Sequence, residues 1–107
     1  EYGSELVEIQ GALNFPTAEL VLRRFAEIAP GDCEVVVDLT LVPRINSVGE
    51  RMLREGLRML GEDGHPVSLV DPHGRIPNPR SYAREAIPVL EDFAEFLEEE
   101  SQPASSS

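Results

Sequence analysis

Residues 33–50 constrain the fold of this chain more than any other stretch, because they join a buried strand to a sharply marked helix start. Residues 35–37 are three consecutive valines, and an unbroken apolar run of this kind is typical of a strand covered on both faces. The sequence Ser-Val-Gly-Glu at 47–50 matches the capping box that opens many helices. In that motif we expect Ser47 to accept a hydrogen bond from the N–H of Glu50, and Glu50 to reach back to the N–H of Ser47.

The residues after this start repeat with the period of an α-helix. Small or apolar residues recur at spacings of three and four, which predicts one buried face on a helix over about 48–60. They are Gly49, Met52, Leu53, Gly56, Leu57 and Leu60. The two glycines are predicted to let the helix backbone lie close to a sheet. A helix that begins where a buried strand ends is a common place for functional sites in α/β domains.

The remaining stretches predict alternating strands and helices. Asn14 and Pro16 supply the capping and first-turn residues of a helix over 18–29. A strand at 87–90 contains Pro88 and is therefore expected at an edge of the sheet. We expect strands at 6–10, 66–70 and 87–90, a possible short strand after Gly11, and helices at 18–29, 81–86 and from Asp92 onward. This order predicts an α/β fold, with a mostly parallel sheet of four or five strands and crossover helices.

Composition narrows the class of protein further. With 107 residues the chain is long enough for one domain, expected over 5–100, with a leader at 1–4 and a disordered tail at 101–107. Its single cysteine, Cys33, excludes an internal disulfide and favours a cytoplasmic, reducing compartment. No apolar run is long enough to span a bilayer, and no secretory signal is present. The first residue is Glu1 rather than methionine, which suggests either a domain excised from a longer protein or a trimmed chain.

The charge balance excludes two classes of partner. Acidic residues number 20 and basic residues 9, for a net charge of −11. Nucleic-acid recognition begins with a basic surface, so a nucleic-acid partner is not expected, and anionic membranes are disfavoured for the same reason. Oligomeric state is left open by the sequence.

The strand end at 38–40, the Pro-Arg-Ile connector at 43–45 and the helix start Asn-Ser-Val-Gly at 46–49 resemble the signature of the STAS domain. This is the fold of bacterial anti-sigma-factor antagonists, and it also occurs at the C-termini of sulfate-type anion transporters. The similarity extends over about 5–100, because Gly11 and the later strands fall in family order. It implies the STAS fold, with four or five mostly parallel strands.

The resemblance also has an implication for phosphorylation at the start of this helix. In the antagonists, the second serine of an Asp-Ser-Ser-Gly pattern is phosphorylated by a partner anti-sigma kinase. A phosphate there would meet the free N–H groups of a helix start, while its charge would disrupt a docked interface. Asn46 takes the place of the aspartate, Ser47 that of the first serine, and Val48 that of the phosphoacceptor. Because Val48 has no hydroxyl, the usual switch is expected to be absent, and Ser47 is a poor substitute since its hydroxyl is expected to cap the helix.

We therefore expect a non-enzymatic regulatory or protein–protein interaction module. Its expected partner is an anti-sigma-like kinase or an attached domain. The expected contact residues are Arg44, Asn46, Ser47, Val48, Gly49, Arg51 and His73. Residues 69–74 and 87–98 also resemble a STAS subgroup that follows the catalytic domain of certain bacterial glutaminases. One alternative is therefore a C-terminal regulatory domain from a glutaminase or an anion transporter.

A second alternative is a sensor that binds a nucleotide or another anion at the helix start, flanked by Arg44, Arg75 and Arg80. Exposed arginines more often pair with carboxylates, so no cofactor is the primary expectation.

Metal and nucleophile sites are not favoured. His65 and His73 flank one short strand with Asp63 and Asp71 nearby, but this spacing does not force metal ligands to converge. A Ser47/His73/Asp71 nucleophilic arrangement is conceivable, since the loops after parallel strands lie together. The chain has neither a nucleophile elbow nor an oxyanion loop, so no catalytic residue is assigned.

Overall fold

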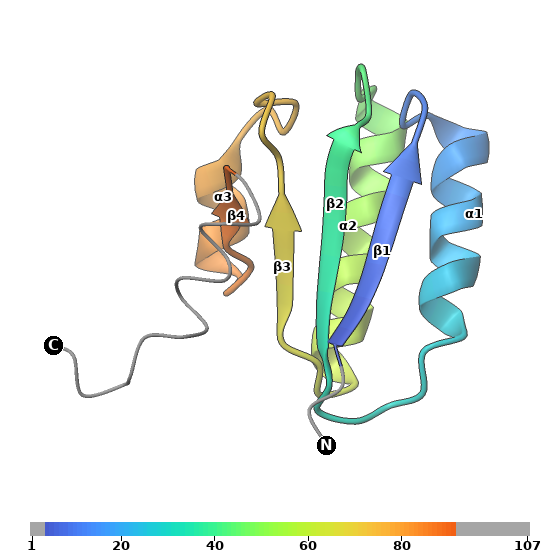
Figure 1. Cartoon of the computed structure of the whole chain (residues 1–107), viewed down its shortest axis with the longest axis vertical. Coiled ribbons are helices and arrows are strands. Elements are labelled where there is room, and N and C mark those ends of the chain that lie inside the picture. The colour runs from blue at the N-terminus through green and yellow to red at the C-terminus, as the bar shows by residue number, and fades with distance from the viewer. Residues whose placement is uncertain (1–3, 92–107) are drawn as a thin grey trace, which may run out of the picture.

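The structure is a computed structural model, and it describes residues 4–91 of the chain. Within that span four strands and three helices alternate (Figure 1). The strands are β1 (Ser4–Gln10), β2 (Glu34–Leu41), β3 (Val67–Val70) and β4 (Val89–Leu90). The helices are α1 (Phe15–Ala26), α2 (Ser47–Glu62) and α3 (Pro79–Arg84).

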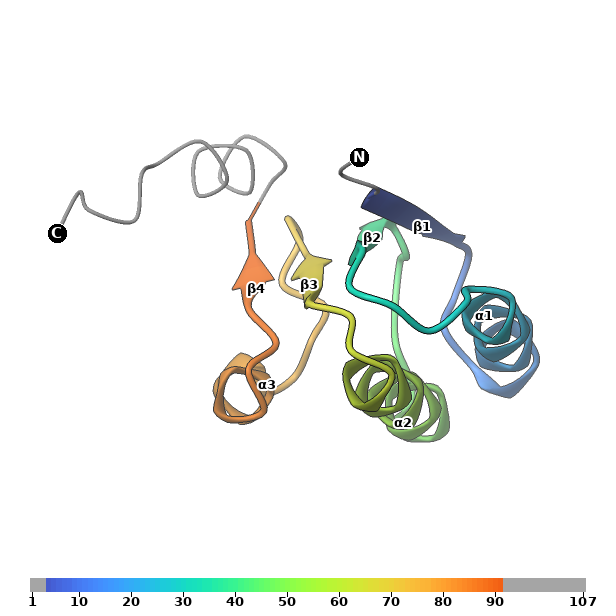
Figure 2. The same ribbon diagram turned by 90° about the horizontal axis from the view of Figure 1, so that it is seen from below.

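The four described strands form one parallel sheet in the order β1-β2-β3-β4. The helices that connect them lie on one side of the sheet (Figure 2). The predicted parallel α/β architecture is therefore confirmed, and β4 lies at an edge as Pro88 required. The possible short strand directly after Gly11 is absent from the described residues, because Leu13 makes only a single parallel bridge with Ile45.

The core lies between the sheet and the helices, and alternate residues of each strand point into it. Val35 and Val37 of β2 belong to this main cluster, whereas Val36 points to the other face and packs with Val70 and Leu90 in a second buried cluster. All three valines are buried, as the unbroken apolar run predicted.

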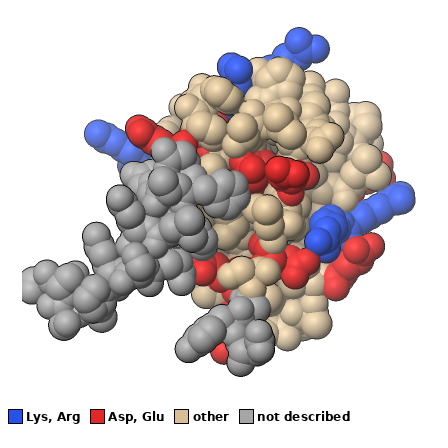
Figure 3. All heavy atoms as spheres, viewed as in Figure 1, with Lys and Arg blue, Asp and Glu red and all other residues tan. Residues whose placement is uncertain are grey.

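Seen from the open side of the sheet, acidic side chains reach the middle of the surface and basic ones lie at its margin (Figure 3).

Two of the three glycines of α2, Gly49 and Gly56, do allow close approach, but not to the sheet. A Cβ atom at Gly49 would lie 2.1 Å from the carbonyl oxygen of Leu13, which is in the loop before α1. A Cβ atom at Gly56 would lie 2.5 Å from Leu22 and 2.7 Å from Phe25, both of α1. The predicted contact with a sheet was therefore wrong, because α2 meets the core through its larger apolar residues and uses the glycines against a loop and a helix.

Several boundaries differ from the sequence expectation for local reasons. Helix α1 begins at Phe15, because the side chain of Asn14 accepts from the N–H of Thr17 at 3.2 Å and caps it there. Helix α3 begins at Pro79, ahead of the expected start at residue 81, because proline suits a first turn, where its missing N–H would have no partner. Ser4 belongs to β1 rather than to a leader. The helix expected from Asp92 and the tail at 101–107 lie outside the described residues.

Candidate functional site

The candidate site lies at the edge of the sheet where the parallel strands end and α2 begins. Backbone hydrogen bonds join two loops there: the N–H of Leu13 donates to the carbonyl of Arg44 at 2.9 Å, and the N–H of Asn46 donates to the carbonyl of Leu13 at 3.1 Å. The loop after β3 is attached by Arg75, whose Nε donates to the carbonyl of Val42 at 3.2 Å. Three loops are thus held together around the start of α2.

The strand end that carries the family-like sequence is held by its own side chains. One carboxylate oxygen of Asp38 accepts from the N–H of Thr40 at 3.0 Å and from its hydroxyl at 2.5 Å. Asp38 is buried, and Leu39 between the two points into the core. The Asp-Leu-Thr motif therefore has a structural role, since it satisfies polar groups at the point where β2 ends.

The helix start differs from the predicted capping box. Asn46, not Ser47, is the N-cap residue, and its side-chain oxygen accepts from the N–H of Gly49 at 2.7 Å. The N–H of Glu50 donates to the backbone carbonyl of Asn46. The prediction failed by one residue, because the bridge between Ile45 and Leu13 keeps the chain extended only up to Asn46. Ser47 is already in the first turn and exposed.

This assignment leads to a paired prediction. Asn46→Ala is expected to lower the free energy of unfolding by about 1 kcal/mol, because the N–H of Gly49 loses its acceptor. Ser47→Ala is the matched control, and its effect is expected to be within about 0.5 kcal/mol. Urea unfolding followed by circular dichroism measures both. A larger loss for Ser47→Ala would restore the capping-box assignment.

Exposed apolar side chains surround this helix start. Phe15 at the start of α1 is 54% exposed, Leu41 at the end of β2 is 50% exposed, and Val48 on α2 is 48% exposed. They come from the segments that the loop hydrogen bonds join. We call this region the carboxyl-edge surface, and it comprises Phe15, Leu41, Arg44, Asn46, Ser47, Val48, Arg51 and His73.

All but one of the predicted contact residues are exposed. Arg44, Asn46, Ser47, Val48, Arg51 and His73 are exposed, whereas Gly49 is buried against Leu13. Phe15 and Leu41 were missed, although a large apolar residue at a cap or beyond the last core position of a strand was a usable signal. Neither Arg44 nor Arg51 forms an ion pair with another described residue.

The conceivable nucleophilic arrangement is not assembled. Asp71 is buried, and its two carboxylate oxygens accept from the N–H groups of Arg75 and Ile76, each at 2.9 Å. Within the described span no hydrogen bond joins Asp71 to His73, or His73 to Ser47. Asp71 therefore shapes the loop after β3 and does not orient a catalytic histidine.

His65 lies at the other edge of the sheet and is buried. Its Nδ1 lies 2.8 Å from the carbonyl oxygen of Cys33, and its Nε2 lies 3.0 Å from that of Ala29. This imidazole ties the start of β3 to the loop before β2, which is a structural role. Across residues 4–91 no group of three His, Cys, Asp or Glu side chains is arranged to hold a metal ion.

A partly buried polar cluster beside the site was not foreseen. The hydroxyl of Tyr82, which is 0% exposed, donates to Glu50 at 3.0 Å. The guanidinium of Arg54 lies 4.3 Å from the centre of the Tyr82 ring, pairs with Glu50 at 3.7 Å and donates to Ser81. The cluster links α2 to α3. The only sequence signal for it was the i,i+4 spacing of Glu50 and Arg54.

A polar cavity of about 440 Å³ adjoins this cluster. Its lining includes Ser47, Glu50, Arg51, Arg54, Asn78 and Ser81. Hydroxyl, amide and guanidinium groups of this kind can all donate hydrogen bonds to an anion.

The cluster also leads to a pH prediction. Burial raises the pKa of Tyr82 to about 12, and the nearby Glu50 carboxylate acts in the same direction against the guanidinium of Arg54. The folded state therefore holds the phenol proton more tightly than the unfolded state, whose phenol titrates near 10. This stabilising contribution is complete below pH 10 and is lost as the pH rises through 12.

Absorbance of the phenolate measures this titration directly. The chain has two tyrosines and no tryptophan, so Tyr2→Phe leaves Tyr82 as the only phenol. In that variant a midpoint near 12 is expected. A midpoint near 10, as for a free phenol, would contradict the buried cluster. Glu50→Gln serves as the control and is expected to lower the midpoint, because it removes the neighbouring negative charge.

Comparison with known proteins adds three findings at the level of sequence. The sequence model of the STAS domain family matches residues 3–78. A glutaminase of Corynebacterium efficiens is 33% identical over 73 residues, which is 68% of this chain and 17% of that protein. A glutaminase of Corynebacterium glutamicum is 36% identical over 72 residues, which is 67% of this chain and again 17% of that protein. The chain therefore spans about a sixth of the length of these curated relatives.

Two solved structures are also similar. The crystal structure of Mglu superposes with a TM-score of 0.63 at 37% identity, over 66% of this chain and 18% of that one. The STAS domain of a SulP transporter from Vibrio cholerae superposes with a TM-score of 0.62 at 17% identity, over 92% of this chain and 85% of that one. The second likeness establishes the fold alone. In the part of this chain that the structure describes, no helix has the length and apolar character needed to cross a membrane.

Proposed function

The chain belongs to the STAS domain family, and on that basis we propose that it is a non-catalytic regulatory module that docks a protein on its carboxyl-edge surface. The observation that carries the proposal is the exposure of Phe15, Leu41 and Val48 around one capped helix start. Apolar side chains gathered at one place and rimmed by polar ones are typical of protein-interaction sites. Arg44 and Arg51 supply the polar rim and suit an acidic group on the partner.

The proposed docking is not controlled by phosphorylation at the usual position. Val48 stands where the antagonists carry their phosphoacceptor, and its side chain is apolar and half exposed. A phosphate at that position would place about two negative charges inside a contact, whereas valine adds apolar area to it. The module is therefore proposed to be constitutively competent to bind.

We propose that the partner is an attached domain of a larger protein. The support is the pair of corynebacterial glutaminases, of which this chain matches only 17%. In this proposal the STAS module contacts the remainder of a glutaminase-like protein and adjusts its activity, in the reducing cytoplasm that a single cysteine favours. A free-standing antagonist that binds an anti-sigma-like kinase is the alternative partner.

Hydrogen exchange tests the docking directly. Amides at 41–51 are expected to exchange more slowly in the product of the full natural reading frame than in the isolated 107-residue chain. Val48→Asp is expected to abolish that difference, because it buries an unpaired carboxylate in the contact. Met59→Asp is the matched control, since Met59 lies on the same helix with 49% exposure. Equal exchange in the two proteins, or equal effects of both variants, would contradict an attached-domain contact.

A nucleotide or anion sensor remains the second candidate function. The polar cavity of about 440 Å³ lined by Arg51 and Arg54 favours it. Titration calorimetry with ATP, GTP and inorganic phosphate separates the two functions. An interaction module is expected to give no binding heat, whereas binding that disappears in Arg51→Ala would favour the sensor.

A further inference from the structure

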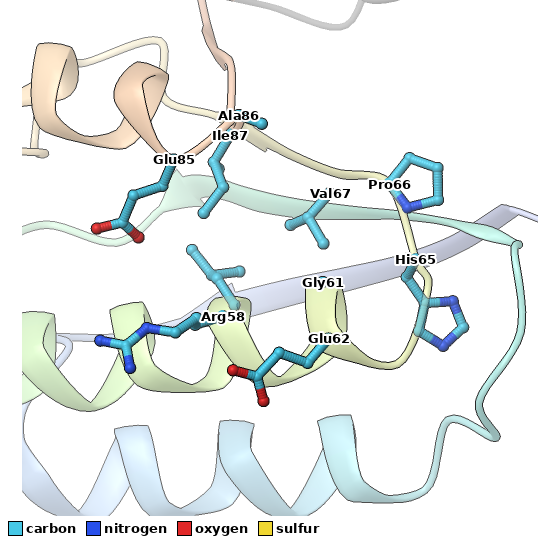
Figure 4. A pocket seen from close by; sticks show the side chains of 10 residues that line it. Arg58, Gly61, Glu62, His65, Pro66, Val67, Glu85, Ala86 and Ile87 are labelled. Carbon is cyan, nitrogen blue, oxygen red and sulfur yellow. The ribbon is translucent and has the colours of Figure 1, made fainter.

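A larger hollow lies at the opposite edge of the sheet from the carboxyl-edge surface. It is a groove of about 610 Å³ between α2 and the residues that follow α3 (Figure 4). We call it the α2–α3 groove and define it by Leu57, Gly61, Glu62, Val67, Glu85 and Ile87. Leu57, Val67 and Ile87 are themselves buried and give it an apolar floor.

The fold fills the corresponding space between α1 and α2 but leaves this one open. Gly56 lets α2 lie directly against Leu22 and Phe25 of α1. Toward α3, by contrast, α2 is linked through Arg54 and Tyr82, and the groove lies one to two turns further along α2, at residues 57–62. The helix-covered face of the sheet therefore has a gap at this position, into which apolar core residues are directed.

The rim of the groove carries two carboxylates, Glu62 and Glu85, and one guanidinium, that of Arg58. Glu62 is the last residue of α2, and Glu85 is the C-cap residue of α3. A helix C-terminus carries partial negative charge, so a carboxylate there is unfavourable and a cation is favourable. Helix α2 has no basic residue in its last turn, whereas α3 has Arg84 there. Neither Glu62 nor Glu85 forms an ion pair within residues 4–91, since Arg58 on the rim pairs with Glu55 at 3.2 Å.

We propose that the α2–α3 groove binds a basic amphipathic helix of a partner protein. An aliphatic or aromatic side chain of that helix fills the space above Leu57, Val67 and Ile87, and its lysine or arginine side chains pair with Glu62 and Glu85. This is the helix-in-groove mode of recognition, with apolar residues for affinity and charges for orientation. A second copy of this chain is a poor occupant, because each copy carries a net charge of −11.

The proposed groove is separate from the carboxyl-edge surface. It lies at the edge where β3 begins, and the other surface lies where β2 ends and α2 begins. The module could therefore hold two proteins, or two parts of one protein, at the same time. Binding in the groove does not depend on docking at Val48, so this inference goes beyond the function proposed above.

Nuclear magnetic resonance with a defined probe tests the groove. The probe is a short helical peptide of leucine and lysine with one apolar face, added to the isotope-labelled chain. Shift changes are expected at the amides of Gly61, Val67, Ala86 and Ile87. The same peptide with glutamate in place of lysine is expected to give none, because it meets the negative rim with like charge.

Two sets of variants make the test specific. A Cβ atom at Gly61 would meet no other atom within 4 Å, so Gly61→Leu should fold, fill the groove and weaken binding at least tenfold. Gly31→Leu is the matched control, because Gly31 is equally unobstructed and does not line the groove. The double variant Glu62→Gln/Glu85→Gln is expected to weaken binding about tenfold at low salt and to reduce its salt dependence.

Several outcomes would overturn the proposal. Shift changes centred on other exposed apolar residues, such as Leu6 or Leu20, would show that the peptide binds elsewhere. Unchanged affinity of the peptide for Gly61→Leu, or equal binding of the glutamate peptide, would also contradict the proposed groove site. Concentration-dependent shifts at the groove in the absence of peptide would identify a second copy of the chain as the occupant.

Discussion

Replacing Gly49 with alanine is expected to lower the free energy of unfolding by about 3 kcal/mol. The added Cβ atom would lie 2.1 Å from the carbonyl oxygen of Leu13 and 2.6 Å from its carbon, and both are backbone atoms. They cannot move aside easily, because hydrogen bonds hold Leu13 in place: its N–H donates to the carbonyl of Arg44, and its carbonyl accepts from the N–H of Asn46. The substitution should therefore displace the start of α2 and disturb the carboxyl-edge surface with it.

Urea unfolding of Gly49→Ala measures this loss, and Gly61→Ala is its control. Both glycines lie in α2, where alanine is intrinsically favoured by about 1 kcal/mol. Gly61 faces open space, so Gly61→Ala is expected to stabilise the chain slightly. If Gly49→Ala also proved neutral or stabilising, the close approach of α2 to Leu13 would be wrong.

Replacing Asp71 with alanine has the second large expected effect, a loss of about 3 kcal/mol. Its carboxylate accepts from the N–H groups of Arg75 and Ile76, and both donors lose their partner when it is removed. Each unsatisfied buried donor costs roughly 1–3 kcal/mol. The loop after β3 should also loosen, because Arg75 joins it to Val42.

Thermal unfolding and hydrogen exchange at the amides of 73–76 measure the effect of Asp71→Ala. Asp71→Asn is the informative control, since an amide keeps one oxygen acceptor and should lose only about half as much stability. A change within about 0.5 kcal/mol in Asp71→Ala would mean that water replaces the carboxylate.

The sequence was sufficient for the architecture because its signals were local and agreed with each other. The valine run at 35–37, the helical period after residue 47 and Pro88 before an edge strand each predicted an element that the structure contains. The errors arose where a contact distant in sequence decides the outcome. Nothing near Asn46 indicates that Ile45 is bridged to Leu13, yet that bridge moves the cap from Ser47 to Asn46.

The candidate site was predictable in position but not in composition. The order of strand, connector and capped helix was enough to locate Val48 and Arg44 at the end of the sheet. Phe15 and Leu41 join them only because parallel strands bring three loops to one edge. The pairing of Tyr82 with Glu50 spans 32 residues and had no counterpart in the local pattern.

The strand order β1-β2-β3-β4 has a consequence for how the chain folds. Each strand pairs with the next one along the chain, so that Ser4 lies opposite Glu34 and Leu69 opposite Val89. No described strand has to enter between two strands that have already paired. The sheet can therefore grow outward from β1 and β2 by one strand and one helix at a time. The entropic cost of closing each loop varies only slowly with loop length. No single late strand pairing is therefore expected to dominate the folding barrier.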